Sequence, residues 1–240
     1  MNERSSGLVM RVRPLTDTSL IVHWLTPDLG RIATVAKGAR QPKSPFAGKL
    51  DLCFAADFSF VRSRRSELHA LREVVVRETH SGLRADHGLL VQAAYAVAFI
   101  EQVTETETPL PEIHEVLAAF LAYLPTQPPR PRSVFAFELK ILAASGLAPD
   151  SEASGLRPGS RDLLERLTES GWADLVELQP AAADARAVRD FLHGFILQHC
   201  QKIPRGRAEA LRAGTEEWSS PAKGPKATDA AAAEAKRTQP

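Results

Sequence analysis

Alternating apolar and polar positions mark the first third of the chain. Across residues 8–14, the side chains of Leu8, Met10 and Val12 fall on one face of an extended chain and two arginines fall on the other. A period of two is typical of a half-buried strand. Four more segments rich in β-branched and aromatic residues follow, at residues 19–26, 31–37, 54–61 and 67–78. Five short strands predict a small closed barrel, because closure hides the sheet edges.

From about residue 89 the apolar positions recur with a helical period. Residues 89–103 are apolar nearly all round, as in a helix buried within a bundle. Residues 186–203 repeat apolar side chains at i, i+3, i+4 and i+7. Two further helices are predicted at residues 111–124 and 133–146, with a proline-rich segment between them. The chain therefore reads as an α+β protein, with a β-barrel over residues 1–84, a helical domain over 85–205 and a disordered tail over 206–240.

Composition places this chain among ordinary soluble globular proteins, with 44% apolar and 25% charged residues. No apolar run reaches the roughly 18 residues that a membrane span needs. The N-terminus lacks the apolar core of a signal peptide, so we expect a cytoplasmic protein with no membrane partner. The two cysteines, Cys53 and Cys200, lie far apart in sequence, which fits a reducing compartment.

The net charge of +1 conceals a division of charge along the chain. Residues 1–84 carry 14 Lys and Arg against 8 Asp and Glu, whereas residues 85–204 carry 9 against 16. Such asymmetry suggests that the basic part meets a polyanion and the acidic part does not. Surface charge distributed by chance is the alternative interpretation.

The segment VAKGARQPKS, residues 35–44, resembles a phosphate-binding loop at first sight. A Walker A loop needs G-x-x-x-x-G-K-[ST], and here the spacing is one residue short. Pro42 stands where the second glycine belongs and has no N–H to donate. The loop instead presents Lys37, Arg40 and Lys43, which can neutralise the phosphates of a nucleic-acid backbone. A merely solvated hairpin loop is the alternative.

Further cations extend the predicted nucleic-acid site. Small barrels with positive loops commonly bind single strands, with aromatic side chains stacked on the bases. Phe46, within the basic loop, is the better candidate for stacking, and Trp24 is expected to lie in the core. The remaining candidate DNA contacts are Lys49, Arg62, Arg64, Arg65, Arg11 and Arg13.

Motifs for catalysis or metal binding are missing from the sequence. There is no C-x-x-C, H-E-x-x-H, G-x-S-x-G or glycine-rich dinucleotide motif. Two distant cysteines cannot supply a four-cysteine zinc site. We therefore expect no enzyme activity, no cofactor and no bound metal.

The N-terminal residues resemble a known family at this point. The strand, the turn LTPDLGR and the loop AKGAR-x-x-KS follow the order found at the start of the RecO family of bacterial recombination mediators. ELHALRE resembles its last barrel strand, FELKILAASGLAPD its central helix, and residues 186–203 its C-terminal helix. The resemblance covers about residues 7–205.

This resemblance implies an OB-fold barrel followed by a helical domain. It implies binding of single- and double-stranded DNA and annealing of complementary strands, in DNA repair and recombination. It also implies cooperation with RecR and the single-strand-binding protein in loading RecA onto gapped DNA, and hence association with the nucleoid. The family's DNA-contacting region maps onto Lys37, Arg40 and Lys43, and then onto Arg62, Arg64 and Arg65.

The chain departs from the family where many members carry four zinc-binding cysteines. No cysteine lies between Pro149 and Gln198, so zinc is not predicted, and the segment is expected to pack on Leu163, Leu164, Leu167 and Trp172. A groove flanked by Arg130, Arg132 and Lys140 is predicted to accept an acidic and apolar tail such as that of the single-strand-binding protein. An OB-fold module that binds RNA and a protein-interaction adaptor stay open as alternatives.

Overall fold

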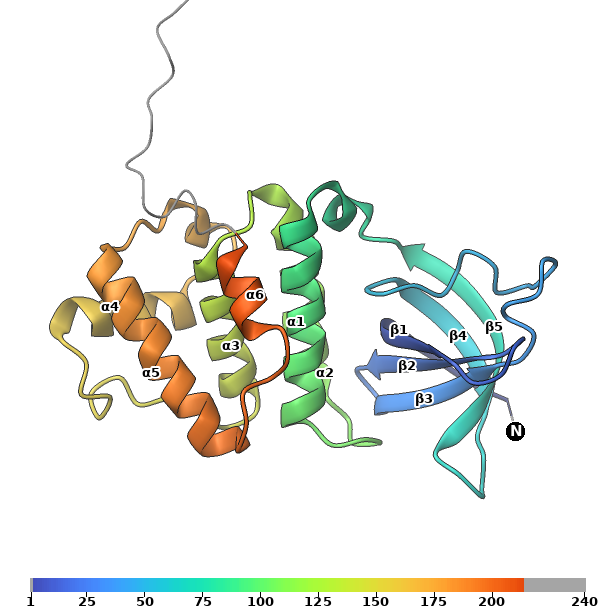
Figure 1. The fold of residues 1–240 in the computed structure, drawn as a ribbon. Helices are drawn as coiled ribbons and strands as arrows, with labels where there is room; N and C mark the ends of the chain where they lie inside the picture. Colours follow the sequence, from blue (N-terminus) through green and yellow to red (C-terminus); the bar gives the residue numbers. More distant parts are fainter. Residues whose placement is uncertain (1, 214–240) are drawn as a thin grey trace, which may run out of the picture.

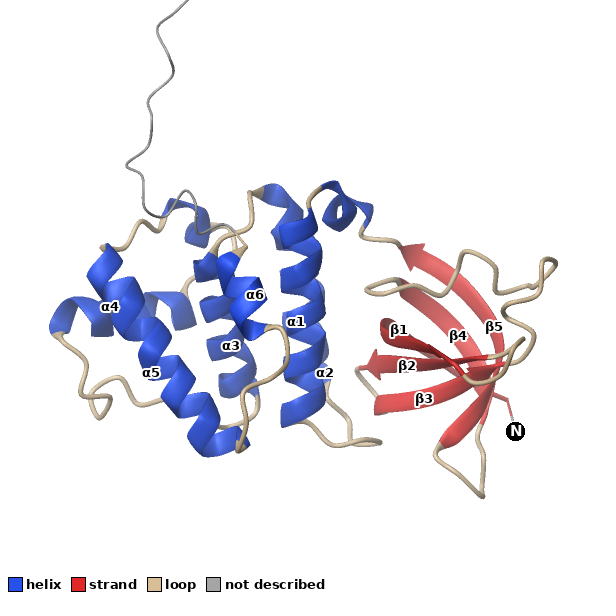
Figure 2. Ribbon diagram, viewed as in Figure 1, coloured by secondary structure: helices blue, strands red, loops and turns tan. Residues whose placement is uncertain are grey.

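The computed structural model describes residues 2–213 and forms two adjoining parts, a β-barrel and a helical domain. Strands occupy one part and helices the other (Figure 2). This arrangement confirms the predicted α+β fold with an N-terminal five-stranded barrel. The predicted tail beyond residue 213 lies outside the described residues.

The barrel closes in the strand order β1-β2-β3-β5-β4. Only β3 and β5 pair in parallel, and their pairing is short, from Ala33 opposite Leu68 to Val35 opposite Ala70. The other neighbours are antiparallel, which is the arrangement of an OB-fold. The strands are β1 (Asn2–Pro14), β2 (Leu20–Thr26), β3 (Gly30–Ala36), β4 (Ala55–Val61) and β5 (Leu68–Glu78).

Aromatic side chains fill the barrel interior. Trp24 is fully buried and stacks on Phe58 with ring centroids 4.1 Å apart. Its indole N–H donates to the hydroxyl of Thr34 at 2.8 Å, which satisfies the polar end of a buried ring. The prediction that Trp24 belongs to the core is confirmed.

A bulge in β1 changes the predicted alternation. The pairing with β2 shifts between Val9 and Arg11, so Val9 points into the barrel while Leu8 and Met10 pack against the helices. The prediction of one shared face for Leu8, Met10 and Val12 is wrong at Val12, which joins the barrel core. One strand thus serves two hydrophobic cores.

The helical domain surrounds one almost fully buried helix. This helix, α3, begins at Pro131, two residues earlier than predicted, and its residues from Pro131 to Leu139 are all buried. The helix α1 begins after Asp86, whose side chain accepts from the N–H of Gly88 at 2.6 Å. The α-helices are α1 (His87–Val103), α2 (Pro111–Tyr123), α3 (Pro131–Ala144), α4 (Pro158–Glu169), α5 (Ala182–Cys200) and α6 (Arg207–Arg212), and 3₁₀ turns lie at η1 (Ser81–Ala85), η2 (Leu124–Thr126) and η3 (Asp174–Glu177).

The segment that replaces the family's cysteines folds around α4. The predicted packing residues Leu163, Leu164 and Leu167 are buried on its inner face. Trp172 follows and contacts the rings of Phe120 and Tyr123 at 5.3 and 5.2 Å. An apolar contact therefore holds this lobe on α2.

The predicted boundary of the tail at residue 206 is wrong, because α6 packs into the helical domain. The Arg207 guanidinium is buried and pairs with both oxygens of Glu138, at 2.7 and 2.9 Å. The hydroxyl of Tyr95 donates to the same carboxylate at 2.5 Å. This buried pair, between residues 69 positions apart, fixes the last described helix to α1 and α3.

The segment between α1 and α2, residues 104–110, lies against the barrel and is called the connector here. Its Glu107 N–H donates to the carbonyl of Arg31 at 3.0 Å, and its Leu110 N–H donates to the carbonyl of Pro27 at 3.2 Å. Gly30 has a φ of +65°, and a Cβ there would lie 1.7 Å from the carbonyl oxygen of Thr108. The connector thereby covers the end of β3 that β5 leaves unpaired.

Candidate nucleic-acid interface

The first candidate surface is the loop between β3 and β4, residues 37–54, called the basic loop. It is a succession of turns, aided by positive φ angles at Gly38 and Gly48. The side chains of Lys37, Lys43 and Lys49 have no hydrogen-bond or ion-pair partner among the described residues, and Lys37 and Lys43 are exposed. These ammonium groups are available to an anion.

Arg40 fixes the start of the basic loop to the loop between β1 and β2. Its N–H donates to the carbonyl of Thr18 at 3.0 Å, and its guanidinium donates to the carbonyl of Thr16 at 3.3 Å. The side chain is still exposed. Arg40 therefore has a structural contact in addition to the predicted role.

Phe46 does not lie on the surface, so the prediction that it stacks on bases is wrong. Its ring is 6% exposed and belongs to the barrel core together with Val9 and Trp24. The loop folds back so that this ring covers the interior of the barrel. Phe46 anchors the loop, and its burial leaves the lysines on the outside.

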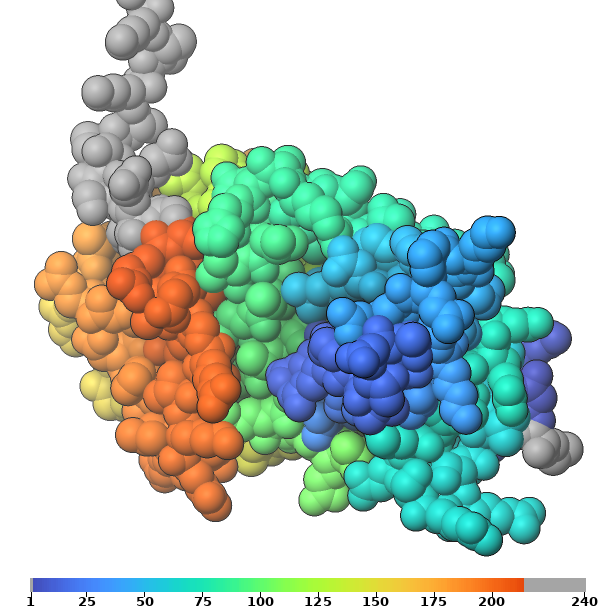
Figure 3. All heavy atoms as spheres, turned by 45° about the vertical axis from the view of Figure 1, so that its right-hand side comes forward, coloured from blue at the N-terminus to red at the C-terminus, as the bar shows by residue number. Residues whose placement is uncertain are grey.

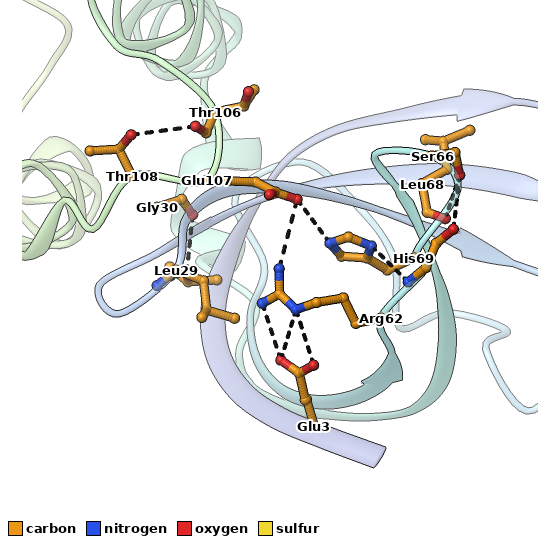
Figure 4. A network of polar contacts seen from close by, with 12 residues as sticks. Glu3, Leu29, Gly30, Arg62, Ser66, Leu68, His69, Thr106, Glu107 and Thr108 are labelled. Atoms are coloured by element: carbon orange, nitrogen blue, oxygen red, sulfur yellow. Dashed lines mark hydrogen bonds and ion pairs between the residues drawn. The ribbon is translucent and has the colours of Figure 1, made fainter. Parts of the chain in front are cut away.

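The second candidate surface is the turn between β4 and β5, residues 62–67, called the basic hairpin. Arg64 and Arg65 are exposed, and their side chains have no partner among the described residues. Arg62 differs, because its guanidinium donates to both carboxylate oxygens of Glu3 and lies 3.8 Å from Glu107 (Figure 4). The hydrogen bond with Glu3 raises the pKa of Arg62. Arg62 thus stabilises the hairpin, and the other two arginines are the ones that face solvent.

Glu107 of the connector joins this hairpin to the rest of the molecule. Its carboxylate lies 3.2 Å from Nε2 of the buried His69 and 3.8 Å from Arg62 (Figure 4). Its own N–H donates to the carbonyl of Arg31 in β3. The other ring nitrogen of His69, Nδ1, faces the N–H of Ser63 at 3.4 Å. A single residue of the connector therefore bridges β3, the basic hairpin and β5.

The two basic segments do not form one patch. In Figure 1 the basic loop lies at the upper right of the barrel and the basic hairpin at the lower right. The turned view separates them in the same way, with the connector beside the hairpin (Figure 3). The outer surface of the barrel lies between them.

The outer face of β1, β2 and β3 also carries cations. Arg11 lies opposite His23, and Arg13 lies opposite Ile21 in the strand register. Burial lowers the pKa of His23, and the neighbouring charges of Arg13, Arg11 and Arg31 lower it further. His23 and Arg31 were missed as candidates, although alternate positions in the predicted strands could have identified them.

Two of these arginines hold the barrel to the helices. Arg11 forms an ion pair with Glu101 of α1. Arg31 donates from its guanidinium to the carbonyl of Thr104 in the connector. A small hollow of about 170 Å³ lies beside Arg31 and Glu101. Arg11 is therefore committed to the junction between the two parts, and Arg13 is the exposed cation of this face.

The predicted groove for an acidic tail is not formed by the residues expected. Arg132 is buried and donates to the carbonyl of Leu178 at 2.8 Å and to the side-chain oxygen of Gln127 at 2.9 Å. Lys140 donates to the carbonyls of Thr168 and Ser170, both at 2.8 Å, and burial lowers its pKa. Both side chains hold the lobe around α4, so this prediction is wrong for them.

Arg130, the third of these residues, is half-buried, and its carbonyl accepts from the side chain of Gln92 at 3.0 Å. Its contact with an acidic tail stays a prediction, without Arg132 and Lys140 beside it.

The residues present do not fit the family's zinc site. Between residues 2 and 213 no group of three or more His, Cys, Asp and Glu side chains is placed to hold a metal ion. Cys53 is buried, and burial raises the pKa of its thiol to about 12, so it is not a thiolate at neutral pH. No described helix is both long enough and apolar enough to cross a membrane.

Comparison with known proteins agrees with both parts of the fold. The chain matches two models of one family, described as Recombination protein O N terminal over residues 1–80 and Recombination protein O C terminal over residues 84–156. A DNA repair protein RecO from Anaeromyxobacter sp. (strain K) is 34% identical over 149 residues, which are 62% of this chain and 58% of the relative.

Two further relatives carry the same name. The protein from Myxococcus xanthus is 31% identical over 158 residues, covering 65% of this chain and 64% of the relative. The protein from Symbiobacterium thermophilum is 35% identical over 158 residues, covering 61% and 58%. The similarity thus spans about three fifths of the length of these relatives. With both terminal domains matched in order along one chain, this protein belongs to the Recombination protein O family.

Proposed function

We propose that this protein is a recombination mediator in DNA repair that binds single- and double-stranded DNA along the barrel. The observation that carries the proposal is the set of exposed cations on the basic loop, above all Lys37 and Lys43, which have no partner among the described residues. Membership of the family, whose relatives are named DNA repair proteins, supports the same role.

Phosphate neutralisation is the proposed mode of binding. Cations that cover phosphates release condensed counterions, which supplies affinity without reading the base sequence. Arg13, Arg64 and Arg65 extend the path from the basic loop across the outer face of the barrel to the basic hairpin. Phe46 and Trp24, the two aromatic residues considered for stacking on bases, are both buried. Contacts with the phosphate backbone of the DNA therefore dominate the proposed binding.

Annealing of complementary strands follows from the same chemistry. Two single strands repel each other, and bound cations reduce the repulsion while leaving the base edges exposed. The protein would then help to load RecA onto gapped DNA together with RecR and the single-strand-binding protein, and associate with the nucleoid. The acidic helical part repels DNA and is better suited to these protein partners.

The test compares matched double variants by fluorescence anisotropy with a labelled mixed-sequence single strand at several salt concentrations. Replacement of Lys37 and Lys43 by alanine should weaken binding and reduce the slope of log affinity against log salt by about 1.4, since each single-strand phosphate contact contributes roughly 0.7. The control replaces Arg157 and Arg166, two exposed arginines of the α4 lobe, and should bind as the wild type does.

Arg40 is left unchanged in this test because its contacts with the β1–β2 loop would confuse folding with binding. Equal affinity of the Lys37 and Lys43 variant and the control would overturn the assignment of the basic loop. Much tighter binding of an RNA strand of equal sequence would instead favour an RNA-binding module. A second assay with complementary strands should find slower annealing in the basic-loop variant.

A further inference from the structure

The second half of β5 is an open strand edge. The parallel pairing of β5 with β3 ends at Ala70, whereas its antiparallel pairing with β4 continues to Glu78. Every second residue of an antiparallel strand directs its N–H and C=O away from that partner. Within the described part of the chain, no backbone group outside β4 forms a hydrogen bond with residues 71–78. This segment, called the β5 edge, therefore carries unpaired backbone donors and acceptors.

The β5 edge is also accessible and partly apolar. Val75, at its centre, is 55% exposed, which is the largest value for any large hydrophobic side chain among residues 2–213. Arg72 and Glu73 beside it are exposed as well. In Figure 1 the middle of β5 lies on the side of the barrel that faces away from the helices. An open edge with an exposed apolar side chain is a template on which another strand can pair.

The sequence of the β5 edge is complementary to itself. From Arg72 to Glu78 it reads REVVVRE, three valines between two Arg-Glu pairs. When two copies run antiparallel about Val75, Glu73 of each copy lies opposite Arg77 of the other. In the same register the first arginine lies opposite the last glutamate, and valines lie opposite valines. Opposite charges and β-branched pairs stabilise antiparallel strands, so the charges favour a second copy of this chain over an unrelated strand.

We propose that two copies of this chain pair through their β5 edges, antiparallel and about a two-fold axis at Val75. The unpaired backbone groups of each edge then bond to the other copy, and the two barrels share one continuous sheet. The assembly stops at two copies, because a two-fold contact uses the same edge of both molecules and the connector covers the unpaired end of β3. Within the proposed function, such a dimer brings two DNA-binding barrels together, as annealing of two strands requires.

Two bulges in β5 limit the length of this contact. Relative to β4 the register shifts at Arg72 and again at Arg77, so the regular strand between them is Glu73–Val76. Because bulges twist a strand and restrict pairing at its edge, the contact is short and the dimer weak. Arg77 already pairs with Asp57 of β4, but its side chain is 65% exposed and its guanidinium has donors for a second carboxylate.

Sedimentation equilibrium of the full chain, without DNA and over a range of protein concentrations, tests the proposal. The average mass should rise from the 26.2 kDa of one chain toward twice that value as the concentration increases. Val75→Lys places two ammonium groups at the two-fold axis and should abolish the association. The matched control is Val176→Lys, at an exposed valine of the helical domain, and it should associate as the wild type does.

Charge reversal tests the register of the two strands. Glu73→Arg alone and Arg77→Glu alone should each weaken the dimer about tenfold, because an exposed ion pair changes an equilibrium by up to about fivefold and the contact contains two such pairs. Mixed in equal amounts, the two variants carry opposite charges in register and should form a heterodimer as stable as the wild-type dimer. Glu177→Arg and Arg157→Glu, at exposed positions of the helical domain, make the same changes in net charge and should dimerise as the wild type does, alone or mixed.

Three results would overturn the proposal: a wild-type monomer up to the solubility limit, association that survives Val75→Lys, or a mixture of the two β5 charge variants that associates no better than either alone. The second result would mean that another face of the molecule forms the dimer. Circular dichroism and thermal melting check that every variant is folded. None of these measurements involves DNA, so a failure of this proposal is distinguishable from a failure of the proposed function.

Discussion

The basic loop and the basic hairpin present similar cations on very different supports. The loop is anchored within the barrel, by the buried ring of Phe46 and by the contacts of Arg40 with the β1–β2 loop. The hairpin has two anchors, the bonds of Arg62 with Glu3 of β1 and, from outside the barrel, the contacts of Arg62 and His69 with Glu107 of the connector. Two surfaces with the same charge therefore depend on different parts of the molecule.

This difference indicates how the helical domain can affect DNA binding. A change at Glu107 leaves the contacts of the basic loop intact, whereas it removes one of the two anchors of the hairpin that carries Arg64 and Arg65. The hairpin is the part of the candidate interface that can respond to a partner bound to the helices. Four experiments, ordered by the size of the expected effect, examine this comparison.

Removal of the Phe46 ring should have the largest effect. Phe46→Ala empties the space that the ring fills in the barrel, and we expect a loss of about 3 kcal/mol in the free energy of unfolding. Urea denaturation measures this loss. Phe46→Leu, which keeps most of the volume, should lose about 1 kcal/mol. Equal, small losses for both variants would mean that the loop is held by other contacts.

Replacement of Glu107 should loosen the hairpin and spare the loop. Glu107→Gln weakens the contacts with Arg62 and His69, and because Glu107 and Arg62 are partly exposed we expect a cost of about 1 kcal/mol or less. Hydrogen exchange should become several times faster over residues 62–68 and stay unchanged over residues 37–50.

Glu105→Gln is the matched control for this experiment, because Glu105 is exposed in the same connector and has no partner among the described residues. Faster exchange in both basic segments after Glu107→Gln would contradict the separation of their supports.

DNA affinity provides a third comparison of the two segments. Arg64→Ala with Arg65→Ala should lower the salt slope by up to about 1.4, as in the loop variant. In the Glu107→Gln background the same double change should reduce DNA affinity less, because a mobile hairpin has already lost part of its contacts with DNA. Strictly additive losses of affinity would argue against positioning by Glu107.

The outer face between the two segments should give the smallest effect, a dependence on pH. The pKa of His23 is lower in the folded protein than its usual 6.5, so the unfolded chain binds more protons between these two values. Stability contributed by neutral His23 is therefore lost as the pH falls below about 6.5. Urea denaturation at about pH 7 and pH 5 should find a smaller loss in His23→Gln than in the wild type.

Most of the regular elements could be predicted because they depend on local patterns, whereas α4 and the first half of β1 were not predicted. Alternation identified the five strands, and prolines marked the start of α2 and the turn after it. The bulge at Val9 was beyond prediction, since nothing local distinguishes the extra residue. The helix α6 is short and polar, and contacts with distant residues, such as Glu138 and Gln92, make it part of the fold.

The candidate site was harder to predict because a charged residue in a sequence does not reveal what it contacts. Arg132 and Lys140 resemble surface cations, yet both donate to carbonyl groups that folding brings to them. Phe46 lies among polar residues and is nevertheless buried. Lys37 and Lys43 were identified correctly as exposed because they lie in a long loop between predicted strands.

The double role of β1 has a consequence for modularity. Leu8 and Met10 of β1 and Leu25 of β2 are at most 2% exposed, and the helices cover all three. Exposing such a side chain costs about 1.5 to 3 kcal/mol, so the three together match much of the stability of a small domain. A barrel without its helices would expose this apolar surface to water and would be prone to aggregate. It would also lack the connector that covers β3. The N-terminal and C-terminal parts of the chain match two separate family models. In the folded protein, however, the barrel needs the helices to bury its apolar side chains.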